Sequence, residues 1–470
     1  MESTLLARRA VASGTLGAVA AGSRTAAAIG SAALLDGGSA VDAAVAAALA
    51  ETVLLPPKCG LGGDLVALVL PAGAAAPESL VAIGPAAAGL AGLAERQGWE
   101  VAPTGGAAVG VPGAPAGYAA LADLGRLGRG RLAAPAIALA ERGVPWSAVC
   151  ARLAAEADDL LVRHAPGGSV FRPAAARLPV GTRVRLPGLA RLLRGFVEEG
   201  AGVFAGELGA EVLATVAEHG GVLTAADLAS ARASWSPPTS ARVAGRTVWA
   251  TPDPTHGPAL LGALAAVAGP PGPAEVLAAL ERMNGGRRPA LTGGTSAVAA
   301  VDAEGGAVVV VHSNSWPQFG SGLVVPGLDL VLGNRAGRGF TFEPGHPNAP
   351  VAGRRPRTTL HAWAAADRSG RPAVLGATPG GEQQVPWNAQ LLGRLLASGA
   401  PDGDPVAADL AVGAALAAPR WALDADGRVT GETAGAPPWS ARSSHVVVRV
   451  GGDVVSAAAD PRLDGAAVAV

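Results

Sequence analysis

The apolar residues follow different spacings along the chain, and each spacing predicts one kind of element. Two alanine-rich runs, at residues 24–35 and 39–54, predict helices separated by a glycine turn. Helical spacing also covers residues 111–143 and 189–219 with glycine breaks, and it returns from Val385. Alternating or short continuous apolar runs predict strands at residues 65–70, 248–250, 295–302, 307–311, 323–325 and 373–377.

The polar residues at the start of the second helix have a structural explanation. Ser39 is a suitable N-cap, and Asp42 falls in the first turn, where a carboxylate complements the helix dipole. We therefore assign no catalytic role to Asp42.

The stretch 292–311 holds the most suggestive chemistry in the chain. Two glycines precede Thr295, which begins one strand, and a turn at 302–306 leads into the next. If the Gly294–Thr295 bond were cut, Thr295 would hold both a nucleophilic hydroxyl and a free amine with a pKa of about 7.7–8.0. Nucleophile and general base would then share one residue. Threonine is also common at the start of strands, and the local pattern by itself favours that plainer interpretation.

Three loops carry candidate groups, each with a simpler explanation. Cys59 could be a thiol nucleophile, but a structural thiol is favoured because no histidine lies near it in sequence. For His256, in a Pro/Gly-rich loop, a surface or hydrogen-bonded position is favoured over a place in a site. Gly380 and Gly381 follow a strand and precede a helix. Their N–H groups could bind a developing oxyanion, or the pair could form an ordinary tight turn.

Composition narrows the class of protein. The 470 residues include 36 basic and 37 acidic ones, and this balance gives no reason to expect a nucleic acid or a membrane as partner. Two cysteines are too few for a disulfide framework and fit a reducing compartment. No apolar run approaches the ~20 residues of a spanning helix and no signal peptide is recognisable, so we expect a cytoplasmic protein. No spacing matches a metal site, and residues 270–289 are the best linker candidate.

Several of these stretches together resemble the gamma-glutamyltranspeptidase family of N-terminal nucleophile hydrolases. Residues 37–44 are similar to the family's GGNAVDAA, and residues 295–302 align without a gap with its TTHxSVVD. The stretches follow the family's order over nearly the whole chain: 37–44 (GGSAVDAA), 59–64 (CGLGGD), 111–117 (VPGAPAG), 134–143 (APAIALAERG), 295–302 (TSAVAAVD), 347–348 (PN) and 378–381 (TPGG).

The resemblance implies an α+β fold, the four-layer αββα sandwich, made as an inactive precursor. Thr295 would attack the Gly294 carbonyl and split the chain into segments 1–294 and 295–470, which would remain together as a heterodimer. Thr295 would then be the nucleophile that attacks the substrate.

The same resemblance implies roles for residues around Thr295. Gly380 and Gly381 would supply the oxyanion hole, and Ser313 falls where the family has a hydroxyl residue that orients the nucleophile's amine. Asn314 is expected to contact a small-molecule substrate. The resemblance implies neither a cofactor nor a metal.

The residues that would hold a glutamyl group differ from the family's pattern. Val81 stands where an arginine of the family binds the glutamyl carboxylate, a contact that is hard to replace. Thr358 and Thr359 replace a pair of serines and keep the hydroxyls. A loop that is acidic in the family carries Arg335 and Arg338, which would repel an ammonium and favour a carboxylate or an enolate.

We therefore predict an enzyme that keeps the threonine chemistry and acts on a non-glutamyl small molecule. The bond hydrolysed would be an amide, or a carbon–carbon bond next to a carbonyl, as in relatives from lincomycin and pyrrolobenzodiazepine pathways. Two alternatives remain open. One is a true gamma-glutamyl hydrolase or transferase, and the other is a non-catalytic, unprocessed binding protein of the same fold.

Overall fold

The computed structural model describes residues 11–267, 269–283, 294–398, 404–424, 428–432 and 443–470. The glycine- and arginine-rich end of the predicted linker lies outside these residues, as does Gly293. The described part begins again at Gly294, so both residues of the predicted cleavage site are included.

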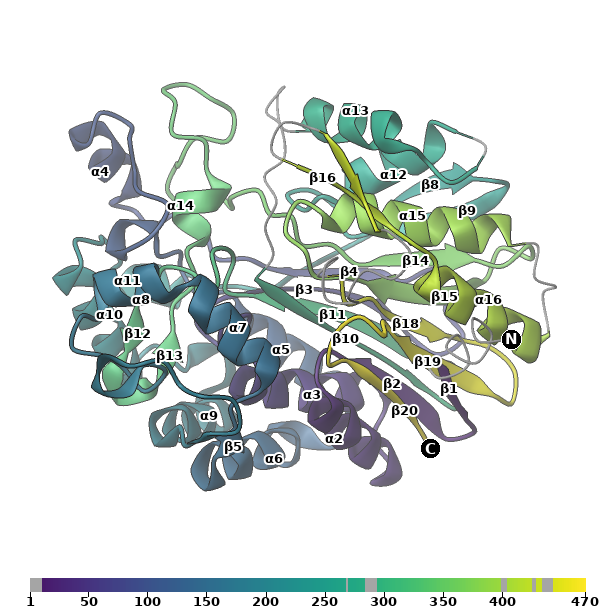
Figure 1. Ribbon diagram of the computed structural model, residues 1–470, viewed down its shortest axis with the longest axis horizontal. Helices are drawn as coiled ribbons and strands as arrows, with labels where there is room; N and C mark the ends of the chain where they lie inside the picture. Colours follow the sequence, from purple (N-terminus) through teal and green to yellow (C-terminus); the bar gives the residue numbers. More distant parts are fainter. Residues whose placement is uncertain (1–10, 268, 284–293, 399–403, 425–427, 433–442) are drawn as a thin grey trace.

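Two antiparallel sheets of seven strands each form the centre of the molecule (Figure 1). The first, called here the β10 sheet, has the order β20 (Ala466–Ala469), β2 (Gly17–Ala21), β10 (Thr295–Asp302), β11 (Ala307–Ser313), β3 (Asp64–Leu70), β4 (Glu78–Ala82) and β7 (Ser234–Ser236). The second, the β15 sheet, has the order β1 (Val11–Gly14), β19 (Val455–Ala459), β18 (Val446–Arg449), β15 (Pro372–Ala377), β14 (Trp363–Ala366), β9 (Arg246–Ala250) and β8 (Thr239–Val243).

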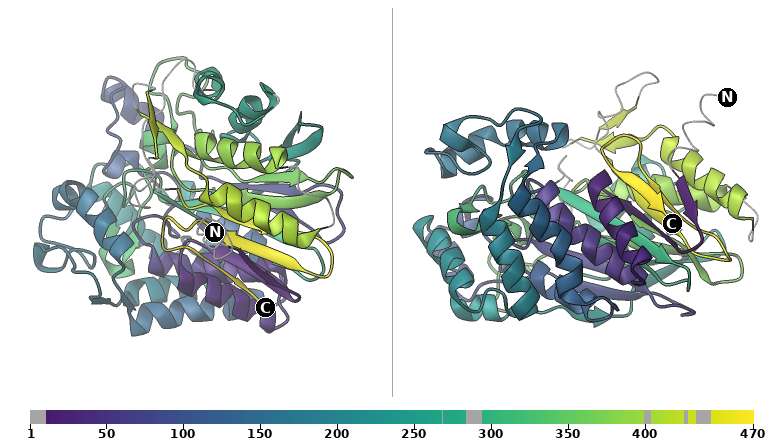
Figure 2. Two further views of the ribbon diagram at one scale, coloured as in Figure 1. Left: turned by 45° about the vertical axis from the view of Figure 1, so that its right-hand side comes forward. Right: turned by 90° about the horizontal axis from the view of Figure 1, so that it is seen from below.

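Helices cover the outer face of each sheet, as the two further views also show (Figure 2). The β10 sheet packs against a group that includes α2 (Arg24–Leu35), α3 (Ala40–Leu54), α5 (Ala114–Ala122), α6 (Gly128–Arg142) and α9 (Pro187–Glu199). The β15 sheet packs against α12 (Gly257–Ala265), α13 (Pro273–Met283), α15 (Gln384–Ala397) and α16 (Pro405–Ala417). A third apolar layer lies between the sheets, so the predicted four-layer αββα sandwich is confirmed.

The other elements lie around this sandwich. The remaining helices are α4 (Leu90–Arg96), α7 (Ala148–Glu156), α8 (Asp158–His164), α10 (Glu207–Glu218), α11 (Ala225–Ala229) and α14 (Arg335–Gly339). The short strand pairs are β5 (Val144–Pro145) with β6 (Arg183–Val184), β12 (Val324–Val325) with β13 (Leu330–Val331), and β16 (Trp421–Leu423) with β17 (Val429–Gly431). Among the described residues no single helix combines the length and apolar composition of a membrane span. One pair, 187–202 with 207–218, meets that test only jointly and is bent by 96°.

The alternation of side chains along β10 decides which residues face the other sheet. Ala297, Ala299 and Val301 pack in the layer between the sheets, whereas Val298 and Ala300 pack against the helices. Thr295 precedes Ala297 by two residues, so its side chain is on the same face of the strand and points into the space between the sheets. Ser296 has the opposite orientation and faces α3.

The predicted cap of the second helix is confirmed, and the structure adds to it. Ser39 and Asp42 form a reciprocal capping box at the start of α3. The buried Asp42 carboxylate also accepts hydrogen bonds from the backbone N–H groups of Arg126 and Leu127, at 2.8 and 3.1 Å. Asp42 therefore joins the helix start to the loop before α6.

Asp42→Ala should destabilise the protein, because it leaves several backbone donors without a partner in the interior. We expect a loss of roughly 3 kcal/mol in the free energy of unfolding, measured by urea denaturation. The control is Asp123→Ala, which removes an exposed carboxylate at the end of α5. Equal midpoints for the two variants would contradict the assigned role.

Candidate functional site

Thr295 lies in a row of polar residues that crosses three neighbouring strands. The antiparallel register places Ser313 of β11 opposite Thr295, and Asp64 of β3 opposite Ser313. The hydroxyl oxygens of Thr295 and Ser313 are 3.0 Å apart, and both residues are buried. The Ser313 hydroxyl donates to the carbonyl oxygen of Gly294 at 2.6 Å, so the Thr295 hydroxyl is the donor in the pair. The carbonyl that precedes Thr295 is thus held by a hydrogen bond.

Gly294 fits this arrangement only because it has no side chain. A Cβ atom at this position would lie 2.3 Å from the carbonyl oxygen of Ser315. Ser315 has a positive φ of 72° and donates its N–H to the Ser313 hydroxyl at 2.9 Å. The loop after β11 therefore packs directly on the peptide before β10.

The row opens into a cavity of about 300 Å³. Residues from widely separated parts of the chain line it: His256, Gly294, Thr295, Ser313, Ser315, Trp316, Arg335, Arg338, Gly339, Phe340, Thr341, Asn348, Arg357, Thr358, Thr359, Gly381 and Glu382. The tertiary structure thus brings together most of the residues that the sequence singled out. Gly380, Asn314 and Val81 are not among the lining residues.

The glycine pair forms the predicted turn between a strand and a helix. Gly380 and Gly381 have φ values of 143° and 55°, between β15 and α15. A Cβ atom on Gly380 would lie 2.4 Å from the ring of Trp387, so this position requires glycine for space as well as for backbone conformation. The turn brings Gly381 of one sheet to the cavity that contains Thr295 of the other.

Arg335 differs from the expectation because its charge has a partner. Its Nε donates to a carboxylate oxygen of Asp64 at 2.7 Å, and both side chains are buried. Burial raises the pKa of Asp64, and the guanidinium of Arg335 opposes that rise. The two residues are far apart in sequence, so their pairing was not predicted.

Arg338, one turn further along α14, is exposed at the cavity. Its guanidinium lies 5.2 Å from the centre of the Trp316 ring, a cation–π contact. Within the described residues the guanidinium of Arg338 forms no hydrogen bond or ion pair, whereas its backbone N–H donates to the carbonyl of Asn334. Arg338 is therefore the more accessible of the two predicted cationic groups.

Two residues predicted to bind substrate lie elsewhere. Val81 is buried in β4, opposite Val66, and packs in the apolar layer between the sheets. Asn314 donates its backbone N–H to the carbonyl of Lys58 and its side-chain amide to that of Pro56. Asn314 therefore holds the loop that precedes β3, and the expected contact with substrate is not supported by its position.

The expectation for His256 was wrong. The residue is buried at the start of α12, lines the cavity, and has no hydrogen-bond partner for Nδ1 among the described residues. Burial, together with the nearby His361, Arg357 and Arg335, lowers the pKa of His256 to about 3. The ring is therefore neutral at neutral pH. The Pro/Gly-rich sequence around it indicated a loop but not its burial.

Glu382 was not singled out from the sequence, although it follows Gly381 directly. Its side chain lines the cavity, and burial raises its pKa to about 7, against the opposing charge of Arg338. A glutamate after two glycines has no local pattern that would mark it as part of a site.

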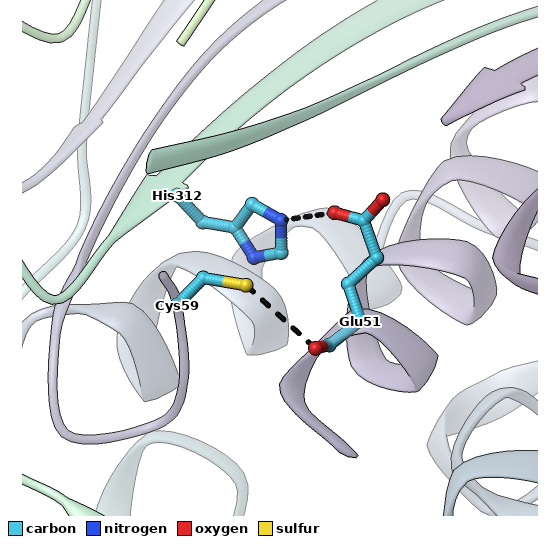
Figure 3. Close-up of side chains that lie close together, drawn as sticks. All are labelled: Glu51, Cys59 and His312. Carbon is cyan, nitrogen blue, oxygen red and sulfur yellow. Dashed lines mark hydrogen bonds and ion pairs between the residues drawn. The ribbon is translucent and has the colours of Figure 1, made fainter. Parts of the chain in front are cut away.

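A second polar cluster lies on the helix side of the β10 sheet (Figure 3). His312 is bound through Nε2 to the Glu51 carboxylate at 2.8 Å and through Nδ1 to the Tyr118 hydroxyl at 2.6 Å. The Cys59 thiol lies within 4.8 Å of ligand atoms of both Glu51 and His312. These are the described residues that could hold a metal ion, but both ring nitrogens of His312 already have partners. We describe the cluster as a hydrogen-bonded anchor for β11.

Comparison with known proteins agrees with this arrangement. A sequence model described as gamma-glutamyltranspeptidase matches residues 26–284 and 273–470. The oxamate amidohydrolase proenzyme of Klebsiella pneumoniae is 31% identical over 460 residues, 85% of this chain and 83% of that protein. The acylase ACY 1 proenzyme of a Pseudomonas species is 33% identical over 261 residues, 52% of this chain and 46% of that protein.

Solved structures extend the likeness to the whole fold. Cephalosporin acylase from Bacillus halodurans has a TM-score of 0.83 and 28% identity, covering 98% of this chain and 97% of its own. The structure named LmbA2991T421A has a TM-score of 0.80 and 26% identity, covering 97% and 99%. The chain therefore belongs to the gamma-glutamyltranspeptidase family and is an N-terminal nucleophile hydrolase.

Proposed function

We propose that the chain cleaves itself between Gly294 and Thr295, and that Thr295 then hydrolyses an amide of a small carboxylic acid other than a gamma-glutamyl compound. The contact of Ser313 with both Thr295 and the Gly294 carbonyl carries the proposal. The names of the relatives also support it, since two are proenzymes, one of an amidohydrolase and one of an acylase.

Self-cleavage begins with attack of the Thr295 hydroxyl oxygen on the carbonyl carbon of Gly294. The Ser313 hydroxyl, which already donates to the carbonyl oxygen, stabilises the negative charge that develops there. The C–N bond breaks, its nitrogen takes the hydroxyl proton, and an ester remains between the two residues. Water hydrolyses the ester and leaves the segments 1–294 and 295–470 as a heterodimer.

Substrate hydrolysis repeats this chemistry on another carbonyl. The free amine of Thr295, a type of group whose ordinary pKa is about 7.7–8.0, takes the hydroxyl proton as the oxygen attacks. Backbone N–H groups of Gly380 and Gly381 stabilise the oxyanion, and Ser313 orients the amine. The proton passes to the leaving nitrogen, and water then releases the acid from Thr295.

The lining of the cavity argues against a glutamyl substrate. Val81, which stands where the family has the arginine for a glutamyl carboxylate, packs between the sheets and supplies no cation, and the exposed Arg338 in the lining would repel a glutamyl ammonium. Arg338 and the hydroxyls of Thr358 and Thr359 suit a carboxylate instead. The volume of about 300 Å³ suits a small acid.

A second candidate is hydrolysis of a carbon–carbon bond next to a carbonyl. The cationic side chains at the cavity favour it, because they would stabilise an enolate or an acidic leaving fragment. The same nucleophile and oxyanion hole would serve both reactions.

Intact mass of the purified protein tests self-cleavage. We expect two fragments that meet at Gly294/Thr295, a single chain for Thr295→Ala, and cleavage slowed by roughly 100-fold for Ser313→Ala. Ser369→Ala, at an exposed serine, serves as the control. A wild-type chain that remains intact after long incubation would refute the mechanism and leave the non-catalytic alternative.

Gly294→Ala tests whether the precursor geometry is needed. The new Cβ atom would meet the Ser315 carbonyl at 2.3 Å and shift the scissile peptide away from Ser313. We expect cleavage to slow by about tenfold or more, followed by gel densitometry over time. Cleavage at the wild-type rate would show that the contact with Ser315 is not required.

Substrate class is tested with the processed enzyme. The specificity constant kcat/KM for a gamma-glutamyl anilide should be at least about 100-fold below that for primary amides of small dicarboxylic acids. The reason is that Val81 stands in the place of the arginine that would bind the glutamyl carboxylate. Release of aniline and of ammonia provides the two readouts. Robust turnover of the glutamyl compound would instead establish a gamma-glutamyl hydrolase.

A further inference from the structure

Among the described residues that line the cavity, Glu382 is the one with an acidic side chain. It follows Gly381, so its backbone is adjacent to the proposed oxyanion hole. The residue is half-buried, and its Oε2 atom is inaccessible to solvent and has no hydrogen-bond partner among the described residues. A carboxylate oxygen in this position lacks the partner that buried polar atoms almost always have.

The positively charged side chains nearby do not supply the missing hydrogen-bond partner of Glu382. Arg338 acts on Glu382 through its charge but forms no ion pair with it, and its guanidinium lies over Trp316. Arg335 is bound to Asp64, and Arg357 donates to the carbonyl of Met283 at 2.6 Å. Among the described residues, therefore, none of these three arginines forms an ion pair with Glu382.

A substrate in the cavity would bring the missing donor. In the proposed function the scissile carbonyl oxygen binds the N–H groups of Gly380 and Gly381, which would place the atoms bonded to that carbonyl near Glu382, the residue after this pair. In an amide, one of these atoms is the leaving nitrogen, which carries N–H groups. In an ester of the same acid, the corresponding oxygen carries none.

We propose that Glu382 forms the subsite for the leaving nitrogen, so that the pocket selects primary amides of small acids over the corresponding esters. The acid's free carboxylate binds on the side of Arg338, and the amide N–H donates to the Glu382 carboxylate. This inference rests on the proposed function and adds the residue that recognises the leaving group.

The test uses matched pairs of substrates with the processed enzyme. Each pair is the primary amide and the methyl ester of one half-acid, from oxalic, malonic or succinic acid. Both members acylate Thr295 with the same group, so they differ only in the atoms that leave. The change in the ratio of their kcat/KM values on substitution therefore reports on recognition of the leaving group.

Two substitutions of Glu382 weaken the proposed hydrogen bond with the leaving nitrogen to different extents. Glu382→Met removes the acceptor at similar size, and kcat/KM for the amide should fall about tenfold or more while that for the ester changes less than about threefold. Glu382→Gln keeps a neutral acceptor and should give an intermediate ratio. Glu95→Gln, at an exposed glutamate of α4, should leave both values unchanged.

The pH dependence gives a readout that a purely structural role would not produce. The carboxylate form accepts the hydrogen bond, so the amide-to-ester ratio of the wild type should rise with pH through about 7. Titration of the Thr295 amine affects both substrates and cancels from the ratio. The pKa of His256, lowered to about 3 by burial and nearby positive charge, lies well below this range, so its charge does not change there. In Glu382→Met the ratio should not change with pH.

The outcomes separate this inference from the proposed function. An equal loss for amide and ester in both variants, or no loss at all, would overturn the role of Glu382 while amide hydrolysis stands. A processed wild-type enzyme that turns over none of the pairs would overturn the substrate class and the subsite with it. An unprocessed chain would refute the proposed function itself. Mass spectrometry of every variant before the assay distinguishes these cases.

Discussion

The antiparallel register between β10 and β11 is the constraint on which the rest of the site depends. It places Ser313 opposite Thr295 and within reach of the Gly294 carbonyl, so one hydroxyl contacts both sides of a single peptide bond. A slip of one residue would turn Thr295 toward the helices. Apolar residues cover both faces of these strands, so the short turn between Asp302 and Ala307 and the hydrogen bonds of His312 to Glu51 and Tyr118 are what oppose that slip.

The same register gives the hairpin a different function on each face. The face between the sheets carries Thr295 and Ser313 toward the cavity, whereas the other carries His312 into its contacts with Glu51 and Tyr118. These contacts join β11 to α3 and α5. The strand that positions the proposed nucleophile is thereby anchored from behind by buried hydrogen bonds, which are short and shielded from water.

Several arginines line the cavity, but they differ in whether an acidic side chain balances their charge. Asp64 balances Arg335, and its place in the row of Thr295 and Ser313 follows from the pairing of β11 with β3. Among the described residues that line the cavity, Arg338 and Arg357 have no ion pair, and burial raises the pKa of the Glu382 carboxyl group to about 7. A pocket of this kind suits a small substrate with an anionic group and a polar leaving group, and it is poorly suited to a glutamyl ammonium.

The amino-acid sequence by itself predicted several of the elements and the proposed site of cleavage. The helices at 24–35 and 39–54 and the hairpin at 295–311 follow from the spacing of apolar residues, and the two glycines after β15 predict a turn, which has backbone angles that few other residues adopt. The burial of His256, the pairing of Arg335 with Asp64 and the position of Glu382 were decided only by the tertiary structure. The physical reason is that desolvation and charge pairing depend on neighbours in space, and the neighbours of these residues come from distant parts of the chain. The place of Val81 between the sheets belongs to the same class, because sequence order shows which residue replaces an arginine but not which direction its side chain takes.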